Sequence, residues 1–362
     1  MLNENLQDVL IDQVWIDWKK RGFPKYPTDQ KWRNLAFQQL MAFKRELIVD
    51  RQRNIIGQSP HGLSLAWSYM EHAWGIKCGK MKTPMEIWED EKHLKKGIQK
   101  ILTGTFFQQK NYYNITESDM RSMLRRYSGT QMVSNFRPTA AAALYDIFVE
   151  KESPLEGTDA GLVWDPSMGY GGRLLGAIAA GVNYIGTDPC VPTYEGLLKI
   201  KEEYGHTHKT YKLLKQGSET YVPQPDTLDF VFTSPPYFGW EQYGEEEEQS
   251  FKKFPEEDMW KEKFLKKTFQ NAYIGLKPGK YMAINVANTK QYKTFEEDTV
   301  QLALESGFDK ADTWWLSLST QQKDSHEKRI ETKDFPSGRK YEPTFIFKKP
   351  LDSVKIEQNE NI

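Results

Sequence analysis

The chain has 362 residues, of which 38% are hydrophobic and 13% aromatic, and its formal net charge is −1. This length suits one large domain with an appendage or two domains, and the composition suits a soluble globular protein. No apolar run approaches the length of a membrane span, and the first 20 residues lack the apolar segment of a signal peptide. Two cysteines, Cys78 and Cys190, form neither a disulfide framework nor, by themselves, a zinc site. We therefore expect a cytoplasmic protein that binds neither a metal nor a membrane.

The charge is distributed unevenly along the chain. Residues 1–130 contain 21 Lys and Arg against 14 Asp and Glu, so the remaining residues carry the balancing negative charge. A basic N-terminal third is compatible with a polyanionic partner. An ordinary solvated helical surface accounts for the same charge equally well.

Residues 1–115 are predicted to form a helical accessory region. Apolar residues recur at helical spacing in two stretches, Phe37, Leu40, Met41, Leu47, Ile48 and then Leu63, Trp67, Met70, Trp74. Thr83-Pro84-Met85-Glu86 has the pattern of a capping box with proline at the first helical position. We expect these apolar stripes to be core, and we expect another short helix from residue 116 to about 127.

From about residue 135 the pattern changes to alternating strands and helices. Strands are predicted over 161–164, 183–186, 210–214, 228–232, 280–286, 311–316 and 344–347. Helices are predicted over 174–180, 194–204, 260–276 and 299–306. This alternation predicts an α/β fold, a doubly wound and mostly parallel sheet, within a domain spanning 116–350. The polar tail, 351–362, is expected to be disordered.

Ligand-type residues follow the first three predicted strands, where a doubly wound sheet binds its ligands. The first strand ends in a glycine-rich turn that starts with Asp165 and contains Gly169 and Gly171. It is not the dinucleotide fingerprint, and an acid at this point favours the ammonium group of an amino acid over a pyrophosphate. Asp188 follows the second strand and suits ribose hydroxyls, and Ser218 follows the third, where it could flank an adenine.

The fourth strand ends in Ser234-Pro235-Pro236-Tyr237. Prolines fix their own φ and restrict the preceding residue, so their carbonyls point in set directions and are free to accept hydrogen bonds. The tyrosine is placed to stack on a flat ring. Alone, this segment is better explained by a proline-rich turn with a packed tyrosine. Its position after three other ligand-type strand ends favours a site that holds the amino group of a nucleobase.

This arrangement resembles the S-adenosylmethionine-dependent amino-methyltransferases that act on DNA bases. Their D-P-x-x-G-x-G loop matches 165–171, their (D/N/S)-P-P-(Y/F/W) tetrapeptide matches 234–237, and their F-x-P segment matches Phe136 to Pro138. The resemblance covers about 130–350 and leaves the helical N-terminal region outside it. It implies a Rossmann-like class I methyltransferase fold with S-adenosylmethionine as the cofactor.

The resemblance also implies roles for matching residues. Asp165, Gly169 and Gly171 would hold the methionine part of the cofactor, with Phe136 beside it and Asp188 on the ribose. The hydroxyl of Ser234 and the carbonyl of Pro235 would accept hydrogen bonds from the target amine, and Tyr237 would stack on the base. No covalent nucleophile is needed, because positioning and electrostatics could supply most of the catalysis. A base in duplex DNA would have to be flipped out.

The leading hypothesis is therefore site-specific DNA methylation at cytosine N4 or adenine N6, with serine in the first position favouring cytosine by resemblance. An RNA base methyltransferase and a non-catalytic nucleic-acid-binding module on the same fold remain as alternatives. Two segments have open roles. The acidic run 245–248 is either a solvated loop or a lid over the cofactor, and the basic stretch 321–340 is either solvated or in contact with nucleic acid.

Overall fold

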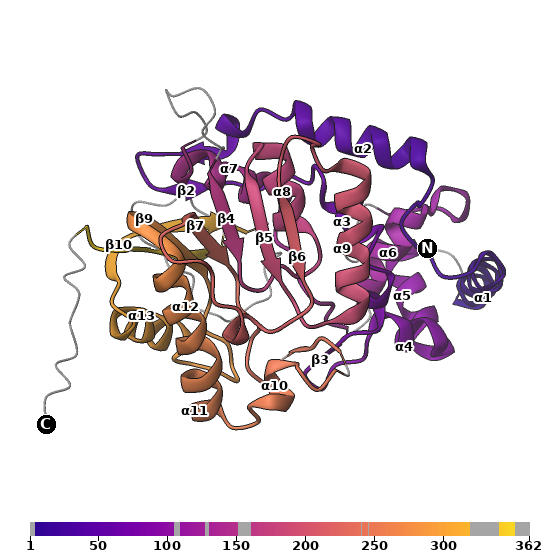
Figure 1. The fold of residues 1–362 in the computed structure, drawn as a ribbon. Coiled ribbons are helices and arrows are strands. Elements are labelled where there is room, and N and C mark those ends of the chain that lie inside the picture. Colours follow the sequence, from indigo (N-terminus) through magenta and orange to yellow (C-terminus); the bar gives the residue numbers. More distant parts are fainter. Residues whose placement is uncertain are drawn as a thin grey trace, which may run out of the picture.

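The central feature of the molecule is a nine-stranded sheet in the residues that the computed structural model describes, 4–104, 109–126, 130–150, 161–239, 241–244, 246–318 and 340–351. The strand order is β1-β2-β10-β11-β9-β7-β4-β5-β6 (Figure 1). Strands β9, β7, β4, β5 and β6 are mutually parallel, and β11 is antiparallel to β9 and β10. The seven main strands are β4 (Leu162–Asp165), β5 (Asn183–Thr187), β6 (Tyr211–Leu214), β7 (Leu228–Thr233), β9 (Leu276–Asn285), β10 (Asp309–Ser317) and β11 (Tyr341–Lys348).

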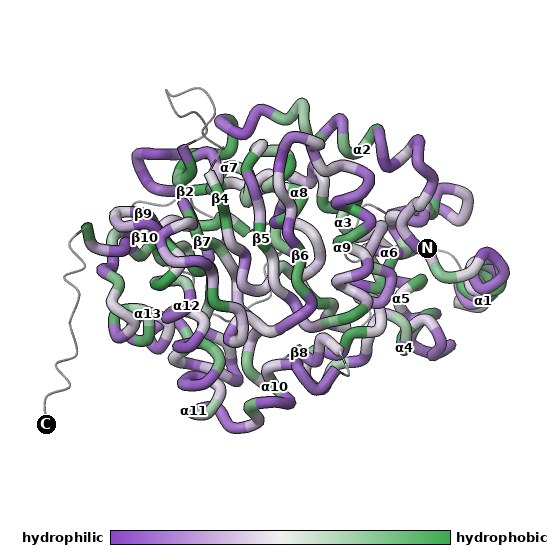
Figure 2. Tube along the Cα trace, in the orientation of Figure 1, coloured by the Kyte–Doolittle hydropathy of each residue, from purple (hydrophilic) through white to green (hydrophobic). Residues whose placement is uncertain are grey.

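Helices cover both faces of this sheet. Along β7, Phe230 and Phe232 pack on one face and Val231 on the other, because successive side chains of a strand point to opposite faces. The first face packs against α7 (Pro138–Phe148), α8 (Gly172–Ala180) and α9 (Val191–Tyr204), and the second against α12 (Lys267–Gly275) and α13 (Phe295–Glu305). Figure 2 shows hydrophobic stretches on the central strands and on α8. The predicted doubly wound, Rossmann-like α/β fold is confirmed.

The segment between β7 and β9 is more irregular than the sequence predicted. The helix expected over 260–276 begins earlier as α11 (Glu257–Trp260), continues through a π-helical turn (Lys261–Lys266) and ends as α12. Before it come β8 (Glu241–Gln242) and the short helix α10 (Ser250–Lys253). Strand β8 pairs with β3 (Lys77–Cys78), so the segment after β7 is attached to the N-terminal part of the chain.

Four N-terminal helices share a core of their own. They are α1 (Glu4–Arg21), α4 (Pro84–Glu89), α5 (Glu91–Thr103) and α6 (Glu117–Arg126), and they lie together beside α9 in Figure 1. The capping box at Thr83 is present, with the Glu86 amide donating to the Thr83 hydroxyl at 3.1 Å. Ile87, Leu94, Ile98 and Ile101 are buried in this core.

The predicted domain boundary at residue 115 does not separate two packing units. The hairpin of β1 (Val49–Asp50) and β2 (Ile55–Ile56) extends the main sheet, with β2 parallel to β10. Helices α2 (Gln30–Ala42) and α3 (Leu63–Trp67) contribute Leu40, Leu65 and Trp67 to the core under α7 and α8. Two-residue strands are too short for a periodic pattern, and for this reason the sequence predicted only helices here. The remaining single turns are 3₁₀ helices at Arg45–Ile48, Glu71–Gly75, Tyr112–Asn114 and Ser218–Thr220.

Two predictions fall outside the described residues. They are the disordered tail, apart from Leu351, and the basic stretch 321–340, apart from Lys340. In the part of the chain that the structure describes, no helix is both long and apolar enough to cross a membrane. Within the same residues, no three His, Cys, Asp or Glu side chains are grouped so that they could hold a metal ion.

Candidate active site

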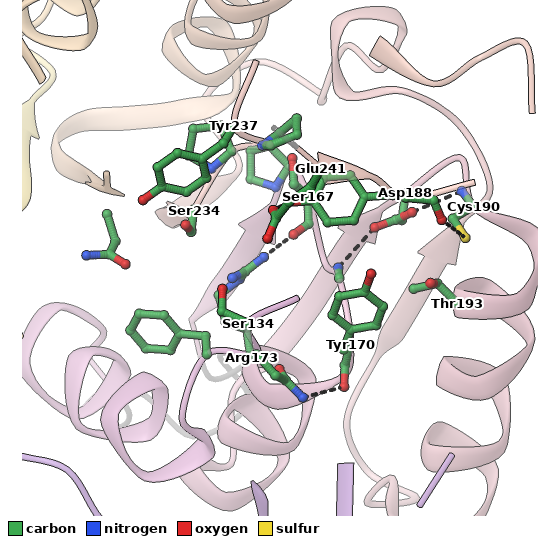
Figure 3. Close-up of a pocket in the computed structure, with 18 of the residues that line it drawn as sticks. Ser134, Ser167, Tyr170, Arg173, Asp188, Cys190, Thr193, Ser234, Tyr237 and Glu241 are labelled. Carbon is green, nitrogen blue, oxygen red and sulfur yellow. Dashed lines mark hydrogen bonds between the residues drawn. The ribbon is translucent and has the colours of Figure 1, made fainter. Parts of the chain in front are cut away.

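A cavity of about 380 Å³ lies at the carboxyl ends of the parallel strands. It is lined by residues from all four predicted strand ends and by the segment before α7. The predicted site residues on its wall are Phe136, Gly169, Asp188, Ser218, Ser234, Pro235, Pro236 and Tyr237. In Figure 3, Ser234 and Tyr237 lie at one end of the cavity and Asp188 with Cys190 at the other, with Glu241 and Ser167 between them. Residues as far apart in the sequence as Phe136 and Tyr237 therefore share one site.

The turn between β4 and α8 has a backbone that only glycine adopts readily. Gly169 has φ +52° and Gly171 φ +85°, both in the left-handed region. Asn135 holds this turn from the outside, because its side chain donates to the Tyr170 carbonyl at 2.9 Å and accepts from the Gly172 amide at 3.2 Å. A Cβ on Gly172 would lie 1.8 Å from the carbonyl oxygen of Phe136. The glycine-rich turn and the segment before α7 are thus closely packed against each other.

Asp165 has a different place from the one predicted. Its carboxylate is fully buried, accepts from the Arg173 Nε at 2.7 Å and the Tyr184 hydroxyl at 2.7 Å, and does not line the cavity. Arg173 is itself 6% exposed and also donates to the Ser167 carbonyl. The acid therefore joins the end of β4 to the start of α8, and its carboxylate lies away from the cavity wall. A buried charge is normally paired, but the sequence pattern did not identify Arg173 as the partner.

Gly171 is likewise absent from the cavity wall and serves as the N-terminal cap of α8. Ser218 lines the cavity, but its hydroxyl bonds with the Thr268 hydroxyl at 2.7 Å in the core. Asn271 donates to the Ser218 carbonyl at 3.2 Å. Helix α12 therefore fixes the position of the turn after β6 through both the hydroxyl and the carbonyl of Ser218.

Asp188 is the acid that faces the cavity from the end of β5. Its two oxygens accept from the backbone amides of Gly169 and Cys190, each at 3.0 Å. Burial raises its pKa to about 6, although the two amides oppose that shift. Each carboxylate oxygen retains a lone pair for a further donor, such as a sugar hydroxyl.

Tyr237 is held firmly at the opposite end of the cavity. Its hydroxyl donates to Glu342 Oε1 at 3.1 Å and accepts from the Ala287 amide at 3.1 Å. Its ring meets Phe295 edge to face, with centroids 5.3 Å apart. Burial raises the pKa of Tyr237 well above its usual range, so the phenol is neutral at pH 7. Ser234 and Pro235 beside it follow directly from the end of β7.

Glu241 is a cavity residue that the sequence reasoning missed. It follows the Pro-Pro segment on β8, is 9% exposed and accepts a hydrogen bond from the Tyr243 hydroxyl. Burial raises its pKa to about 7, and the backbone amide of Ser134 opposes that shift. Part of the predicted acidic run lies near it. Glu246 accepts from the Val191 amide at 2.7 Å at the start of α9, whereas residue 245 is outside the described residues.

Arg137 brings positive charge to the cavity wall. Burial lowers its pKa, as do the nearby positive charges of Arg125 and Arg126. Arg125 donates to the Tyr26 hydroxyl at 2.8 Å and lies over the Trp67 ring. Within the described ranges, no carboxylate forms an ion pair with Arg126 or Arg137. Arg125, Arg126 and Arg137 therefore form a positive cluster next to the site.

Comparison with known proteins gave structural matches only. No family model and no curated protein sequence matches the chain. A SAM-dependent methyltransferase from Methanosarcina mazei is 12% identical with a TM-score of 0.36, and the match covers 58% of this chain and 98% of that one. A SAM-dependent O-methyltransferase from Thermotoga maritima is 12% identical with a TM-score of 0.38, covering 61% and 68%. A TehB-like SAM-dependent methyltransferase from Corynebacterium glutamicum is 13% identical with a TM-score of 0.35, covering 64% and 96%.

Proposed function

We propose that this protein is an S-adenosylmethionine-dependent methyltransferase that methylates an exocyclic amine of a DNA base, cytosine N4 or adenine N6. One observation carries the proposal. The Ser-Pro-Pro-Tyr segment at the end of β7 opens into the same cavity as the glycine turn and Asp188. Residues suited to binding a flat ring with an amino group and residues suited to binding a nucleoside thus line one cavity.

The cavity fits S-adenosylmethionine by its chemistry. Asp188 offers carboxylate oxygens to the ribose hydroxyls, and the Gly169 turn allows a ligand close to the backbone. Glu241, a buried carboxylate without a cationic partner among the described residues, suits the positively charged end of this molecule. When bound, the cofactor supplies a methyl group already activated by its sulfonium.

The residues of the chain then position the acceptor amine. The Ser234 hydroxyl and the Pro235 carbonyl accept the hydrogen bonds of the amino group, so its lone pair is withdrawn from the ring and directed toward the methyl group. The Tyr237 ring stacks on the base and keeps its orientation, because its hydroxyl and its edge are both fixed. Orientation and exclusion of water supply most of the rate enhancement.

The cysteines favour an amine over a ring carbon as the acceptor. Methylation of a ring carbon through a covalent intermediate requires a thiolate nucleophile. Burial raises the pKa of Cys190 to about 11 and that of Cys78 to about 12, so both thiols remain protonated at neutral pH. Only Cys190 lines the cavity, where its thiol donates to the Tyr243 carbonyl at 3.4 Å.

The positive cluster of Arg125, Arg126 and Arg137 supports a nucleic acid as the source of the base. Arginines next to a base pocket are suited to the phosphates on either side of a flipped nucleotide. The same features fit an RNA base methyltransferase, which is the second candidate. A non-catalytic binding module is disfavoured, because binding alone does not require a cofactor subsite and an amine subsite in the same cavity.

Transfer of tritiated methyl from S-adenosylmethionine to DNA and RNA tests the proposal. We expect label in DNA, and we expect Ser234→Ala and Tyr237→Ala to lose most of it while remaining folded, as shown by a cooperative melting transition. An unchanged rate in Tyr237→Ala would refute the assigned site. Label in RNA alone would favour the second candidate.

A further inference from the structure

The cavity needs an acid for the amino-acid end of the cofactor, and Asp165 is not available. Its carboxylate accepts hydrogen bonds from Arg173 and Tyr184 and does not line the cavity. Asp188 is on the wall but bonds to the Gly169 and Cys190 amides at the nucleoside end. The α-ammonium group of the methionine part would therefore lack a counter-charge unless another acid provides it.

Glu241 is the acid with the right surroundings. It is 9% exposed, and its carboxylate accepts hydrogen bonds from neutral donors, the Tyr243 hydroxyl and the Ser134 amide. Throughout the described residues no Lys, Arg or His pairs with it. A buried carboxylate without a cation is unfavourable and is stabilised strongly when an ammonium group arrives.

Its position is also fixed between the two ends of the site. Ser134 precedes Asn135, whose side chain clamps the Tyr170 carbonyl and the Gly172 amide of the glycine turn. On the other side of that turn, the Gly169 amide bonds to Asp188. In Figure 3, Glu241 accordingly lies between Asp188 and the pair Ser234 and Tyr237.

The backbone around Glu241 is built to hold it there. Strand β8 pairs with β3, with Glu241 opposite Cys78. The next turn is held by the Cys190 thiol, which donates to the Tyr243 carbonyl. The carboxylate therefore has a defined direction before any ligand binds, which reduces the ordering needed on binding.

We propose that Glu241 binds the α-ammonium group of the cofactor, and that Asp165 has only a positioning role. This inference rests on the proposed function for its choice of ligand. It adds that the segment after Ser-Pro-Pro-Tyr takes part in cofactor binding as well as in holding the target base.

Isothermal titration calorimetry with two nucleosides tests the inference. S-adenosylhomocysteine carries the α-ammonium group, whereas 5′-methylthioadenosine lacks the amino-acid end. We expect Glu241→Gln to weaken S-adenosylhomocysteine about 10- to 100-fold. The affinity for 5′-methylthioadenosine should stay within about twofold of the wild-type value, since binding of the nucleoside needs no ammonium partner. The matched control is Glu247→Gln, which changes an exposed acid of the neighbouring segment and should alter neither affinity.

Affinity measured over a pH series distinguishes a direct contact from a purely structural role of Glu241, because a structural role would not change the pH dependence of binding. The carboxyl must be ionised to pair with the ammonium, so wild-type affinity for S-adenosylhomocysteine should rise as pH increases through about 7. This step should be absent in Glu241→Gln and for 5′-methylthioadenosine. Equal weakening of both nucleosides, or none, would overturn the proposal. If the wild-type protein binds 5′-methylthioadenosine but not S-adenosylhomocysteine, the ammonium contact is refuted. If it binds neither, the cofactor assignment itself fails.

Discussion

The buried pair of Asp165 and Arg173 gives the most quantitative test of the structure. The pair joins the end of β4 to the first turn of α8 at 2.7 Å, with 0% and 6% of the two residues exposed. Arg173→Met would leave the Asp165 carboxylate buried without its cation. Such changes cost about 3–5 kcal/mol, a large share of the roughly 5–15 kcal/mol that stabilises a typical domain.

The double variant Asp165→Asn with Arg173→Met removes both charges and keeps an amide that can still bond with Tyr184. Because no charge is then left unpaired, we expect most of the lost stability to return. The matched control is Arg53→Met, which breaks an exposed pair with Asp50 at 2.8 Å and should cost at most about 1 kcal/mol.

Urea unfolding followed by tryptophan fluorescence measures these differences in the free energy of unfolding. The single variants Asp165→Asn and Arg173→Met, together with the double variant, form a double-mutant cycle that isolates the coupling between the two side chains. A loss below about 1 kcal/mol in Arg173→Met, or a double variant as unstable as that single one, would contradict the buried-pair account.

Three further outcomes are expected. Tyr237→Phe should lower the free energy of unfolding by about 1–3 kcal/mol, because Glu342 and the Ala287 amide lose their partner. Methyl transfer should persist in this variant, because the ring remains. A transfer rate as low as in Tyr237→Ala would contradict this expectation. Affinity for 5′-methylthioadenosine should fall as pH decreases through about 6, because protonated Asp188 accepts hydrogen bonds from the ribose less well. In calorimetry, Asp188→Asn should abolish this fall in affinity. If the fall persists in that variant, a group other than Asp188 causes it. Arg137→Gln should weaken DNA binding and reduce the slope of log affinity against log salt by about 1, with Arg53→Gln as the control; an unchanged slope would exclude a phosphate contact.

The folded pKa of Asp188 also has a consequence for stability. Burial raises it from 3.8 to about 6, so between those values the folded state holds a proton that the unfolded state has lost. The contribution of this group to stability is therefore greatest below pH 3.8 and is lost as pH rises through about 6. Asp188→Asn should remove this part of the pH dependence.

Much of the fold could be predicted because its main elements have strong local signals. The runs around Val163, Ile185 and Val231 are continuous and apolar, as strands buried on both faces must be, and helices separate them. The hairpin of β1 and β2 could not be predicted, since two-residue strands are defined by their partner β10 rather than by their own sequence.

The site divides in the same way. Residues fixed by a turn next to a strand end, such as Gly169, Asp188 and Tyr237, were predicted because neighbours in sequence place them. The positions of Asp165 and Glu241 depend on tertiary contacts, the ion pair with Arg173 for the first and the pairing of β8 with β3 for the second. No local pattern encodes those partners, so a ligand role was predicted for Asp165, whereas the structure places its carboxylate beside Arg173 and away from the cavity wall.

Nucleoside mass spectrometry of DNA treated with the protein and S-adenosylmethionine would identify the methylated base itself. We expect N4-methylcytosine or N6-methyladenine in the DNA and neither base in DNA treated with Tyr237→Ala. DNA that stays unmodified, or that gains only a ring-carbon product such as 5-methylcytosine, would contradict this expectation.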